Sequence, residues 1–526
     1  MSRVSAISLS AIRKAAAAAL VAAFGLAPSP TPVLAQQPVA IVGATLIDGN
    51  GGEPVSDAVV VVEGERIVAV GPRASVQVPA GARTVDGSGR FLLPGFVDSN
   101  VHLSLYSGGE TFVRYEHRNA DLTREAAQLH LKHGITTVRD SYGSLPPLVQ
   151  VRDEIARGET VGPRMLVAGN IVGWGGPYTV TWNLTRPTGL TLWQEQMNDF
   201  LAQGSGEELL TLTPEELRVA MDAYLDKGPD FIKYGGTGHT SNPDLITFSP
   251  RQQRVIVEAA HARGLVAETH STSVEGLLLS VQAGIDLIQH PEVLDRRITD
   301  ELMDLIVERG VICGPLSNTI TGRAWREYME EKEKEEAEKA DEEAEGQGGV
   351  DEAGILTGSD STEARNRRER TGQEIGQEER EPGMEVRRWN AERMIQAGCI
   401  MVPTTDNYLG NAPEFRREPK HENQEAGIGT IVAIEGLVEL GMTPMEAIVA
   451  STRNGALASR GLDDFGTVEV GKVADLILLE ANPLDDIANI RRLGMVMRAG
   501  QVMDVDALPT QPVWFGKGMS LAPDGR

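Results

Sequence analysis

The chain is poor in several residue types, and each scarcity excludes a class of protein. Only two cysteines occur in 526 residues, which rules out a disulfide framework and a cysteine-rich zinc site. Basic residues number 49 against 75 acidic ones, and a net charge of −26 argues against nucleic acid and anionic membrane surfaces as partners. Histidines number nine, few enough for each to be weighed as a candidate ligand.

The first 35 residues have the composition of a secretory signal peptide. A basic segment (3–14) precedes an apolar run (15–26), and small residues at 33–35 offer a cleavage site. The run is shorter than the ~20 residues of a membrane span, so we expect a periplasmic or secreted protein without stable membrane insertion after the leader is removed. An uncleaved anchor or a mitochondrial presequence is the alternative. Export permits a disulfide between Cys313 and Cys399, although we prefer two buried thiols.

The remaining chain divides by its patterns. Residues 36–93 and 467–526 contain Val-rich runs punctuated by glycine, which predicts a small β-sandwich domain built from both chain ends. Between them, residues 94–466 alternate short apolar runs with helical periodicity. The eight runs lie at 96–102, 135–140, 165–172, 231–234, 265–270, 287–290, 311–316 and 400–406. Eight such repeats predict an α/β fold with a (β/α)8 TIM-type barrel. A doubly wound sheet needs a glycine-rich phosphate loop, which we do not find.

One charged insertion, at about 326–386, interrupts the last repeats. Within it, residues 330–345 hold ten acidic residues and three lysines. So polar a segment cannot bury a core, and we expect a solvated helix or a disordered surface insertion. A mobile lid over the site is the alternative.

Polar side chains end five of the expected strands, where barrel active sites lie. These residues are Asn100 and His102, Lys233, His270, His290 and Asp406. Three histidines together with an aspartate, each on a different repeat, indicate a metal centre. Imidazole and carboxylate ligands suit zinc, and a metal makes hydroxide available at neutral pH.

The motifs carry a family resemblance. In order, LPGFVDSNVH, FIKYGG, VAETHS, LIQHPE and VPTTD resemble the metal-dependent amidohydrolase superfamily, and its imidazolonepropionase/prolidase-like branch in particular. Supporting matches are GITTVRD, STRNGALASRGL and GTVEVGKVADLILLEANPL. The resemblance covers nearly the whole chain after the leader, except for the 326–386 insertion.

The resemblance implies a role for each strand-end residue. Lys233 would be a carboxylated lysine that bridges two divalent ions, zinc being the expected metal. His270 and His290 would bind the more exposed ion. His102 and Asp406 would bind the more buried one, with Asp406 also acting as general base and acid. The family has histidine where this chain has Asn100. Because an amide oxygen is a weaker ligand than imidazole, we expect a weak or vacant position there, and either one or two bound ions.

The expected function is hydrolysis of an amide or peptide-type C–N bond by metal-bound hydroxide, with dipeptides or N-acyl amino acids as substrates. Candidate substrate contacts are Tyr234, His239, Trp174 and Tyr178, with loop packing as the alternative role for each. Two other functions stay open: a catalytically weakened barrel that binds a ligand, and an esterase, carbamate or lactone hydrolase. Barrels of this kind often associate, so a homo-oligomer also stays open.

Overall fold

The structure is a computed structural model that describes residues 37–106, 109–183, 189–239, 243–346, 383–416 and 419–517. The expected signal peptide at 1–35 lies outside these ranges, as does the 347–382 part of the insertion. Among the residues described, no helix combines the length and the apolarity that crossing a membrane requires.

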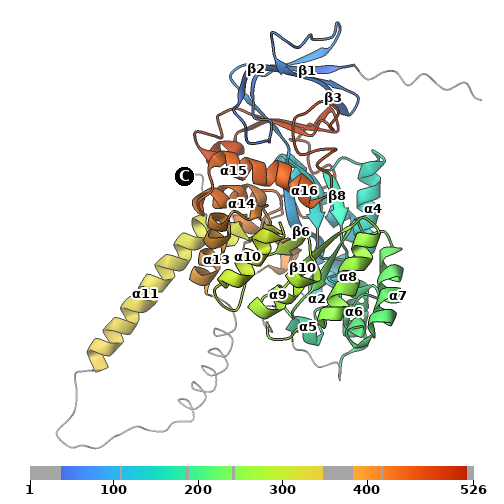
Figure 1. The fold of residues 1–526 in the computed structure, drawn as a ribbon, viewed down its shortest axis with the longest axis vertical. Coiled ribbons are helices and arrows are strands. Elements are labelled where there is room, and N and C mark those ends of the chain that lie inside the picture. The colour runs from blue at the N-terminus through green and yellow to red at the C-terminus, as the bar shows by residue number, and fades with distance from the viewer. Residues whose placement is uncertain are drawn as a thin grey trace, which may run out of the picture.

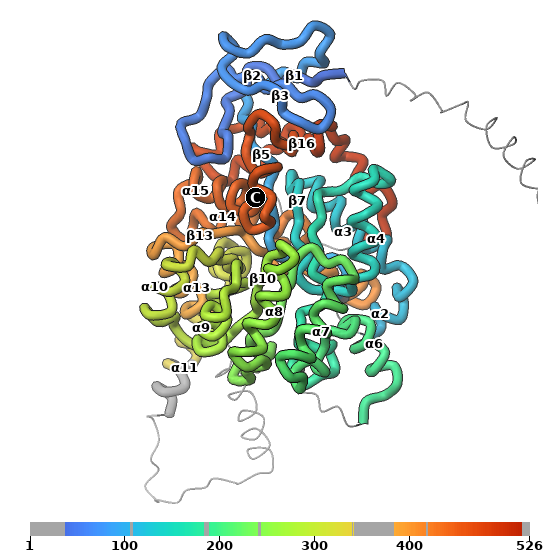
Figure 2. The backbone as a smooth tube through the Cα atoms, turned by 45° about the vertical axis from the view of Figure 1, so that its right-hand side comes forward, coloured from blue at the N-terminus to red at the C-terminus, as the bar shows by residue number. Residues whose placement is uncertain are grey.

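Strands from both chain ends form one eight-stranded mixed sheet. Its order is β17-β16-β15-β5-β1-β2-β3, with β4 paired to β1. The strands are β1 (Val39–Leu46), β2 (Val55–Glu63), β3 (Arg66–Pro72), β4 (Arg83–Asp86), β5 (Phe91–Pro94), β15 (Leu476–Leu479), β16 (Leu493–Arg498) and β17 (Gln501–Val502). Figure 2 shows the N-terminal strands next to β16, at one end of the molecule. Valine and leucine side chains from both ends, such as Val60 and Leu478, pack into one apolar cluster.

The middle of the chain forms two parallel sheets. One has the order β14-β6-β7-β8 and the other β13-β12-β11-β10-β9. Each of the eight expected apolar runs overlaps a strand. These strands are β6 (Phe96–Tyr106), β7 (Ile135–Asp140), β8 (Arg164–Val167), β9 (Phe231–Gly235), β10 (Val266–His270), β11 (Leu287–Gln289), β12 (Ile312–Gly314) and β13 (Ile400–Met401). β14 (Asn407–Gly410) follows β13 closely and pairs with β6.

Backbone contacts link the two parallel sheets. Val172, just after β8, forms a parallel bridge with Tyr234 of β9, and its N–H donates to the Lys233 carbonyl at 2.9 Å. On the other side, the chain from β13 to β14 returns the strand order to β6. The carboxyl ends of β6, β9, β10 and β11 therefore open toward one region.

Helices follow most of these strands and pack against them. They are α2 (Gly109–Tyr115), α3 (Asn119–Lys132), α4 (Leu145–Ala156), α5 (Val180–Asn183), α6 (Leu192–Ala202), α7 (Pro214–Leu225), α8 (Pro250–Ala262), α9 (Val274–Ala283), α10 (Asp300–Glu308), α13 (Met384–Ala397), α14 (Ile428–Glu439), α15 (Pro444–Val449) and α16 (Gly455–Ala458). Local sequence sets their starts: the Ser249 side chain accepts from the Gln252 N–H, and Pro250 occupies the first turn of α8.

The charged insertion begins as a helix. α11 (Gly322–Gly346) spans the acidic run and projects away from the rest of the molecule (Figure 1). Pairs such as Lys334–Glu338, four residues apart, support this exposed helix weakly. The solvated helix expected from composition is therefore present over residues 330–346.

Candidate active site

The polar strand ends converge on a cavity of about 490 Å³. Five of the six predicted residues line it: His102, Lys233, His270, His290 and Asp406. They come from β6, β9, β10, the residue after β11 and the residue before β14. Residues between 102 and 406 therefore meet in one place, as the strand-end rule predicts.

His270 and His290 form one half of the site. Nδ1 of His270 and Nε2 of His290 share a hydrogen bond at 3.1 Å, and the ring planes stand at 89°. Burial lowers the pKa of His290 to about 3, and it lowers the pKa of His270 well below the ordinary value. Both imidazoles are therefore neutral near pH 7, which is the form that binds metals. The His270 Nε2 atom is buried and has no hydrogen-bond partner among the described residues.

His102, Asp406 and Asn100 form the other half. Asp406 Oδ1 accepts hydrogen bonds from His102 Nε2 at 2.8 Å and from Asn100 Nδ2 at 2.9 Å. Burial opposes ionisation of Asp406, but the neighbouring His102, His290 and Lys233 together outweigh it and hold the pKa of this carboxyl well below its usual range. Asp406 is consequently an ionised proton acceptor.

Asn100 is buried, and both ends of its amide are engaged. Its Nδ2 donates to Asp406, and its Oδ1 accepts a short hydrogen bond from the Ser141 hydroxyl on the neighbouring chain segment after β7. The predicted ligand atom, the amide oxygen, therefore shares one of its two lone pairs with Ser141. In this arrangement Asn100 orients Asp406, and its oxygen already accepts one hydrogen bond.

The backbone is strained where two of these side chains enter. Asp406 has φ +55° and His290 has φ +41°, in the left-handed region that side chains other than glycine rarely adopt. Such strain persists where surrounding contacts fix the conformation, and it is concentrated at functional sites.

Lys233 lies between the two halves and is 1% exposed. Its ammonium makes no hydrogen bond within the described ranges. Burial lowers the pKa of Lys233, and neighbouring carboxylates oppose the shift; they belong to Asp406, Glu268 and Asp140. Glu268 is itself held by Arg139 at 2.7 Å, in an ion pair that is almost fully buried.

The donors fit a divalent ion in type. Neutral imidazoles and an ionised carboxylate are the ligands that zinc and similar ions take. Within the part of the chain described, however, no three His, Cys, Asp or Glu side chains already surround a common point as ligands. The side chains instead form two pairs, His270 with His290 and His102 with Asp406. Two buried imidazole nitrogens without a partner among the described residues, Nε2 of His270 and Nδ1 of His102, are the observations that favour an ion.

Three of the four predicted substrate contacts line the cavity, namely Trp174, Tyr178 and His239. The Trp174 indole donates to the Thr237 carbonyl at 3.0 Å and stacks edge-on against His270 at 4.4 Å. Gly235 makes room for this ring, because a Cβ there would lie 2.2 Å from the indole nitrogen.

Tyr234 is the exception and does not line the cavity. Strand alternation turns its side chain away from Lys233, and its hydroxyl donates to Gln253 of α8 at 3.1 Å. It is fully buried in the core between β9 and α8. The expectation that Tyr234 contacts substrate is therefore corrected by its placement.

Three aromatic residues of the cavity were missed from the sequence, namely Tyr142, Trp182 and Tyr408 of β14. Tyr142 follows β7 by two residues, and Trp182 belongs to α5; both line the cavity. A signal existed for Tyr142, because DSYG ends the second strand, and strand ends were the criterion that found the other residues. Trp182 follows a loop and carries no comparable signal.

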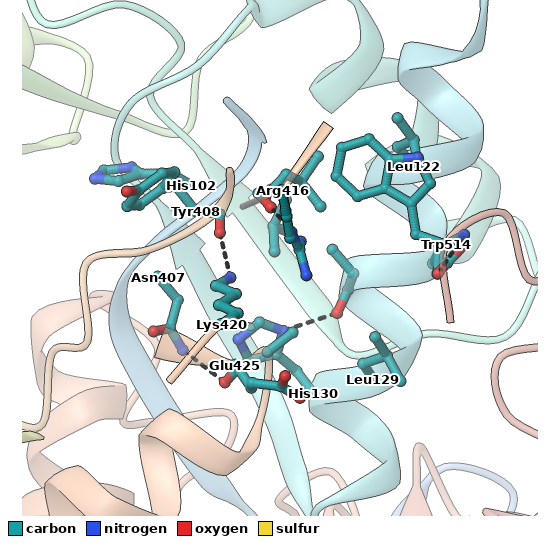
Figure 3. Close-up of a pocket in the computed structure, with 15 residues that line it drawn as sticks. His102, Leu122, Leu129, His130, Asn407, Tyr408, Arg416, Lys420, Glu425 and Trp514 are labelled. Atoms are coloured by element: carbon teal, nitrogen blue, oxygen red, sulfur yellow. Dashed lines mark hydrogen bonds between the residues drawn. The ribbon is translucent and has the colours of Figure 1, made fainter. Parts of the chain in front are cut away.

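A second, smaller cavity of about 40 Å³ shares His102 and Tyr408 with the first, and Figure 3 shows the residues that line it. There the Lys420 ammonium donates to the Tyr408 carbonyl at 2.5 Å, next to Arg416. Burial and the Arg416 charge lower the pKa of Lys420 to about 7. This space is too small for a dipeptide and holds only one of the predicted site residues, so the larger cavity is the candidate active site.

Comparison with known proteins gives consistent matches over most of the chain. A family model described as the Amidohydrolase family matches residues 91–503. Ochratoxinase of Aspergillus niger is 25% identical over 472 residues, which cover 85% of this chain and 82% of that protein. Imidazolonepropionase of Micrococcus luteus is 27% identical over 452 residues, covering 83% and 90%.

Solved structures agree. Molinate hydrolase superposes with a TM-score of 0.75 and 31% identity, covering 91% of this chain and 97% of that one. Phenylurea hydrolase B gives a TM-score of 0.74 and 31% identity, covering 91% and 99%. These likenesses imply a TIM-type barrel, and the matches to imidazolonepropionase confirm the resemblance drawn from the motifs.

Proposed function

The chain belongs to the amidohydrolase family, and from that premise we propose that it is an exported, metal-dependent enzyme that hydrolyses an amide or peptide-type bond in a dipeptide or an N-acyl amino acid. It is a hydrolase that acts on C–N bonds. Its (β/α)8 barrel would carry the site, and the eight-stranded sheet would be the small β-sandwich domain. The observation that carries the proposal is the convergence of His102, Lys233, His270, His290 and Asp406 on one cavity.

The chain's own residues have distinct tasks. His270 and His290 would hold an ion through their facing nitrogens, and His102 with Asp406 would hold a second, with a carboxylated Lys233 between them. When bound, zinc would supply Lewis acidity, which makes water nucleophilic at neutral pH. Asp406, ionised and open to the cavity, takes a proton from water and returns it to the leaving nitrogen. Trp174, Tyr178 and His239 contact the substrate.

Substrate screening tests the activity. Purified protein is assayed with dipeptides, N-acyl amino acids, esters, carbamates and lactones, with zinc, manganese or cobalt added. We expect turnover of amide-type substrates. Turnover of esters, carbamates or lactones alone would replace the amide assignment.

Asn100 favours a second candidate, a barrel that binds a ligand with weakened catalysis. Protein that binds metal normally but turns over no substrate would support that candidate. In the amidohydrolase proposal the buried position binds metal weakly because Asn100 replaces histidine, so Asn100→His should raise metal occupancy. Two tightly held ions per chain in the unmodified protein would contradict this.

The bridging role of Lys233 is tested separately. Lys233→Ala should lose most activity and hold less metal, because the carbamate would be missing. Unchanged activity would overturn the assignment of a carboxylated lysine.

A further inference from the structure

The hydroxyl of Tyr142 is a polar group in the active-site cavity that has no partner. Tyr142 is 2% exposed and lines the cavity. Its hydroxyl makes no hydrogen bond in the described structure. Its oxygen does not belong to the fully enclosed polar atoms without a partner among the described residues, so the hydroxyl is open to the cavity, where a bound group can accept from it.

Other buried tyrosines of the chain do have partners. The Tyr224 hydroxyl donates to the Ala168 carbonyl at 2.7 Å, and the Tyr234 hydroxyl donates to Gln253 at 3.1 Å. The Tyr115 hydroxyl donates to Glu414 at 2.7 Å. Of these four tyrosines only Tyr142 lines the 490 Å³ cavity, and only Tyr142 lacks an acceptor. The missing acceptor is therefore best supplied by a ligand in that cavity.

We propose that Tyr142 is a catalytic residue whose hydroxyl donates a hydrogen bond to the carbonyl oxygen of the scissile bond and to the oxyanion that forms from it. The proposal rests on the proposed hydrolysis. It assigns Tyr142 the stabilisation of developing negative charge, a task that Asp406, as an anion, cannot perform.

Rings, rather than hydrogen bonds, hold Tyr142 in place. Its ring stands edge-on to His102 at 5.9 Å and to Trp174 at 6.4 Å, and it lies against Trp182 at 5.3 Å. The phenol is thus oriented beside a candidate metal ligand before any substrate arrives. Donors fixed in advance in a site that excludes water stabilise a developing charge without reorganisation.

The chemistry balances without any further reactant. The oxygen of water forms a bond to the carbonyl carbon, its proton passes to Asp406, and the carbonyl π pair moves to oxygen. The Tyr142 hydroxyl donates to that oxygen throughout and keeps its proton. The C–N bond then breaks as the carbonyl re-forms, and the leaving nitrogen takes the proton from Asp406. Burial raises the pKa of Tyr142, which keeps the hydroxyl protonated for this role.

Tyr142→Phe removes only the hydroxyl and is the direct test. On zinc-loaded protein with its best substrate from the dipeptide and N-acyl panel, we expect kcat to fall by about 100-fold, the loss typical of one oxyanion donor. KM should change by less than about threefold. The zinc content should be unchanged, and the Tm should stay level, because the hydroxyl makes no hydrogen bond to the described protein that its removal would break.

Tyr224→Phe is the matched control. It removes a buried hydroxyl that has protein partners and lies outside the cavity, so we expect a lower Tm and an unchanged kcat. Unchanged kcat in Tyr142→Phe, with an active parent protein, would overturn the role of Tyr142 and leave the proposed hydrolysis intact. A lower kcat accompanied by a clearly lower Tm of Tyr142→Phe would also overturn the role of Tyr142, since a purely structural role predicts that both decrease. A parent protein inactive on the whole panel would overturn the proposed hydrolysis, and the role of Tyr142 with it.

Discussion

The two halves of the site are built from similar side chains but are bonded differently. In one half, His270 and His290 face each other across 3.1 Å, and the second nitrogen of His270 has no partner among the described residues. In the other, the Asp406 carboxylate already accepts from His102 and Asn100, and the Asn100 oxygen accepts from Ser141. Each half keeps one buried imidazole nitrogen without a partner among the described residues, Nε2 of His270 and Nδ1 of His102. The halves differ in that the first is held by one hydrogen bond between two imidazoles, whereas the second is held by two hydrogen bonds to a carboxylate.

This difference separates metal holding from proton transfer. His270 and His290 would exchange only the 3.1 Å hydrogen bond between their neutral rings for an ion. Asp406 would have to exchange existing hydrogen bonds for an ion, but the same bonds keep it ionised and oriented. We therefore expect the His270/His290 half to dominate metal affinity and the Asp406 half to dominate the rate.

Asp406→Asn should produce the largest effect. An amide cannot take a proton from water, so we expect kcat to fall by about 10³-fold, within the range for loss of a general base. Because His270 and His290 are untouched, at least one zinc ion per chain should remain. Steady-state kinetics and metal analysis of the same sample measure both quantities. Asp286→Asn, which alters a carboxylate outside the cavity, is the control. Loss of all metal together with activity would mean that the two halves do not divide these tasks.

The second-largest expected effect is on zinc affinity, which should differ between variants of the two halves of the site. His290→Ala should weaken zinc binding by more than about 100-fold, because loss of a direct ligand exceeds the ~10–100-fold effect of outer hydrogen-bond partners. Asn100→Ala should weaken binding by less than about tenfold, since its oxygen is already bonded to Ser141. Competition with a chelator at pH 7.5 measures both constants. Equal losses in the two variants would show that Asn100 is a ligand after all.

Much of this site was predictable from the sequence, and the failures have physical causes. The eight strands lie where apolar runs are found, because fully buried parallel strands need continuous apolar residues. The histidines of the site were predictable once the strands were placed, because barrel active sites lie at the carboxyl ends of the strands. Tyr234 was misassigned although strand alternation, with Lys233 facing inward, places its neighbour outward.

Other features needed three-dimensional information. The bond between Ser141 and Asn100 joins two adjacent strands, and its geometry depends on an irregular register between β6 and β7. No spacing rule gives that register. The orphan hydroxyl of Tyr142 is likewise visible only when the partners of all buried tyrosines are known.

The smallest expected effect is on the pH dependence of stability, and it comes from His130 of α3, a buried histidine outside both halves of the site. Burial lowers the pKa of His130 to about 4, while its Nδ1 bonds to the Ala126 carbonyl at 2.8 Å. The unfolded chain takes up a proton near pH 6.5 and the folded chain only near pH 4, so stability is full above pH 6.5 and falls as pH drops through this window. At pH 5 this single group should cost about 2 kcal/mol of unfolding free energy. Urea unfolding of the parent and of His130→Gln at pH 5 and 7.5 measures the cost, and the variant should depend less on pH. If the free energy of unfolding depends on pH identically in both proteins, other groups, including the site histidines, cause the loss of stability in acid. Metal affinity and rate of the two halves of the site would then have to be compared above about pH 6.5.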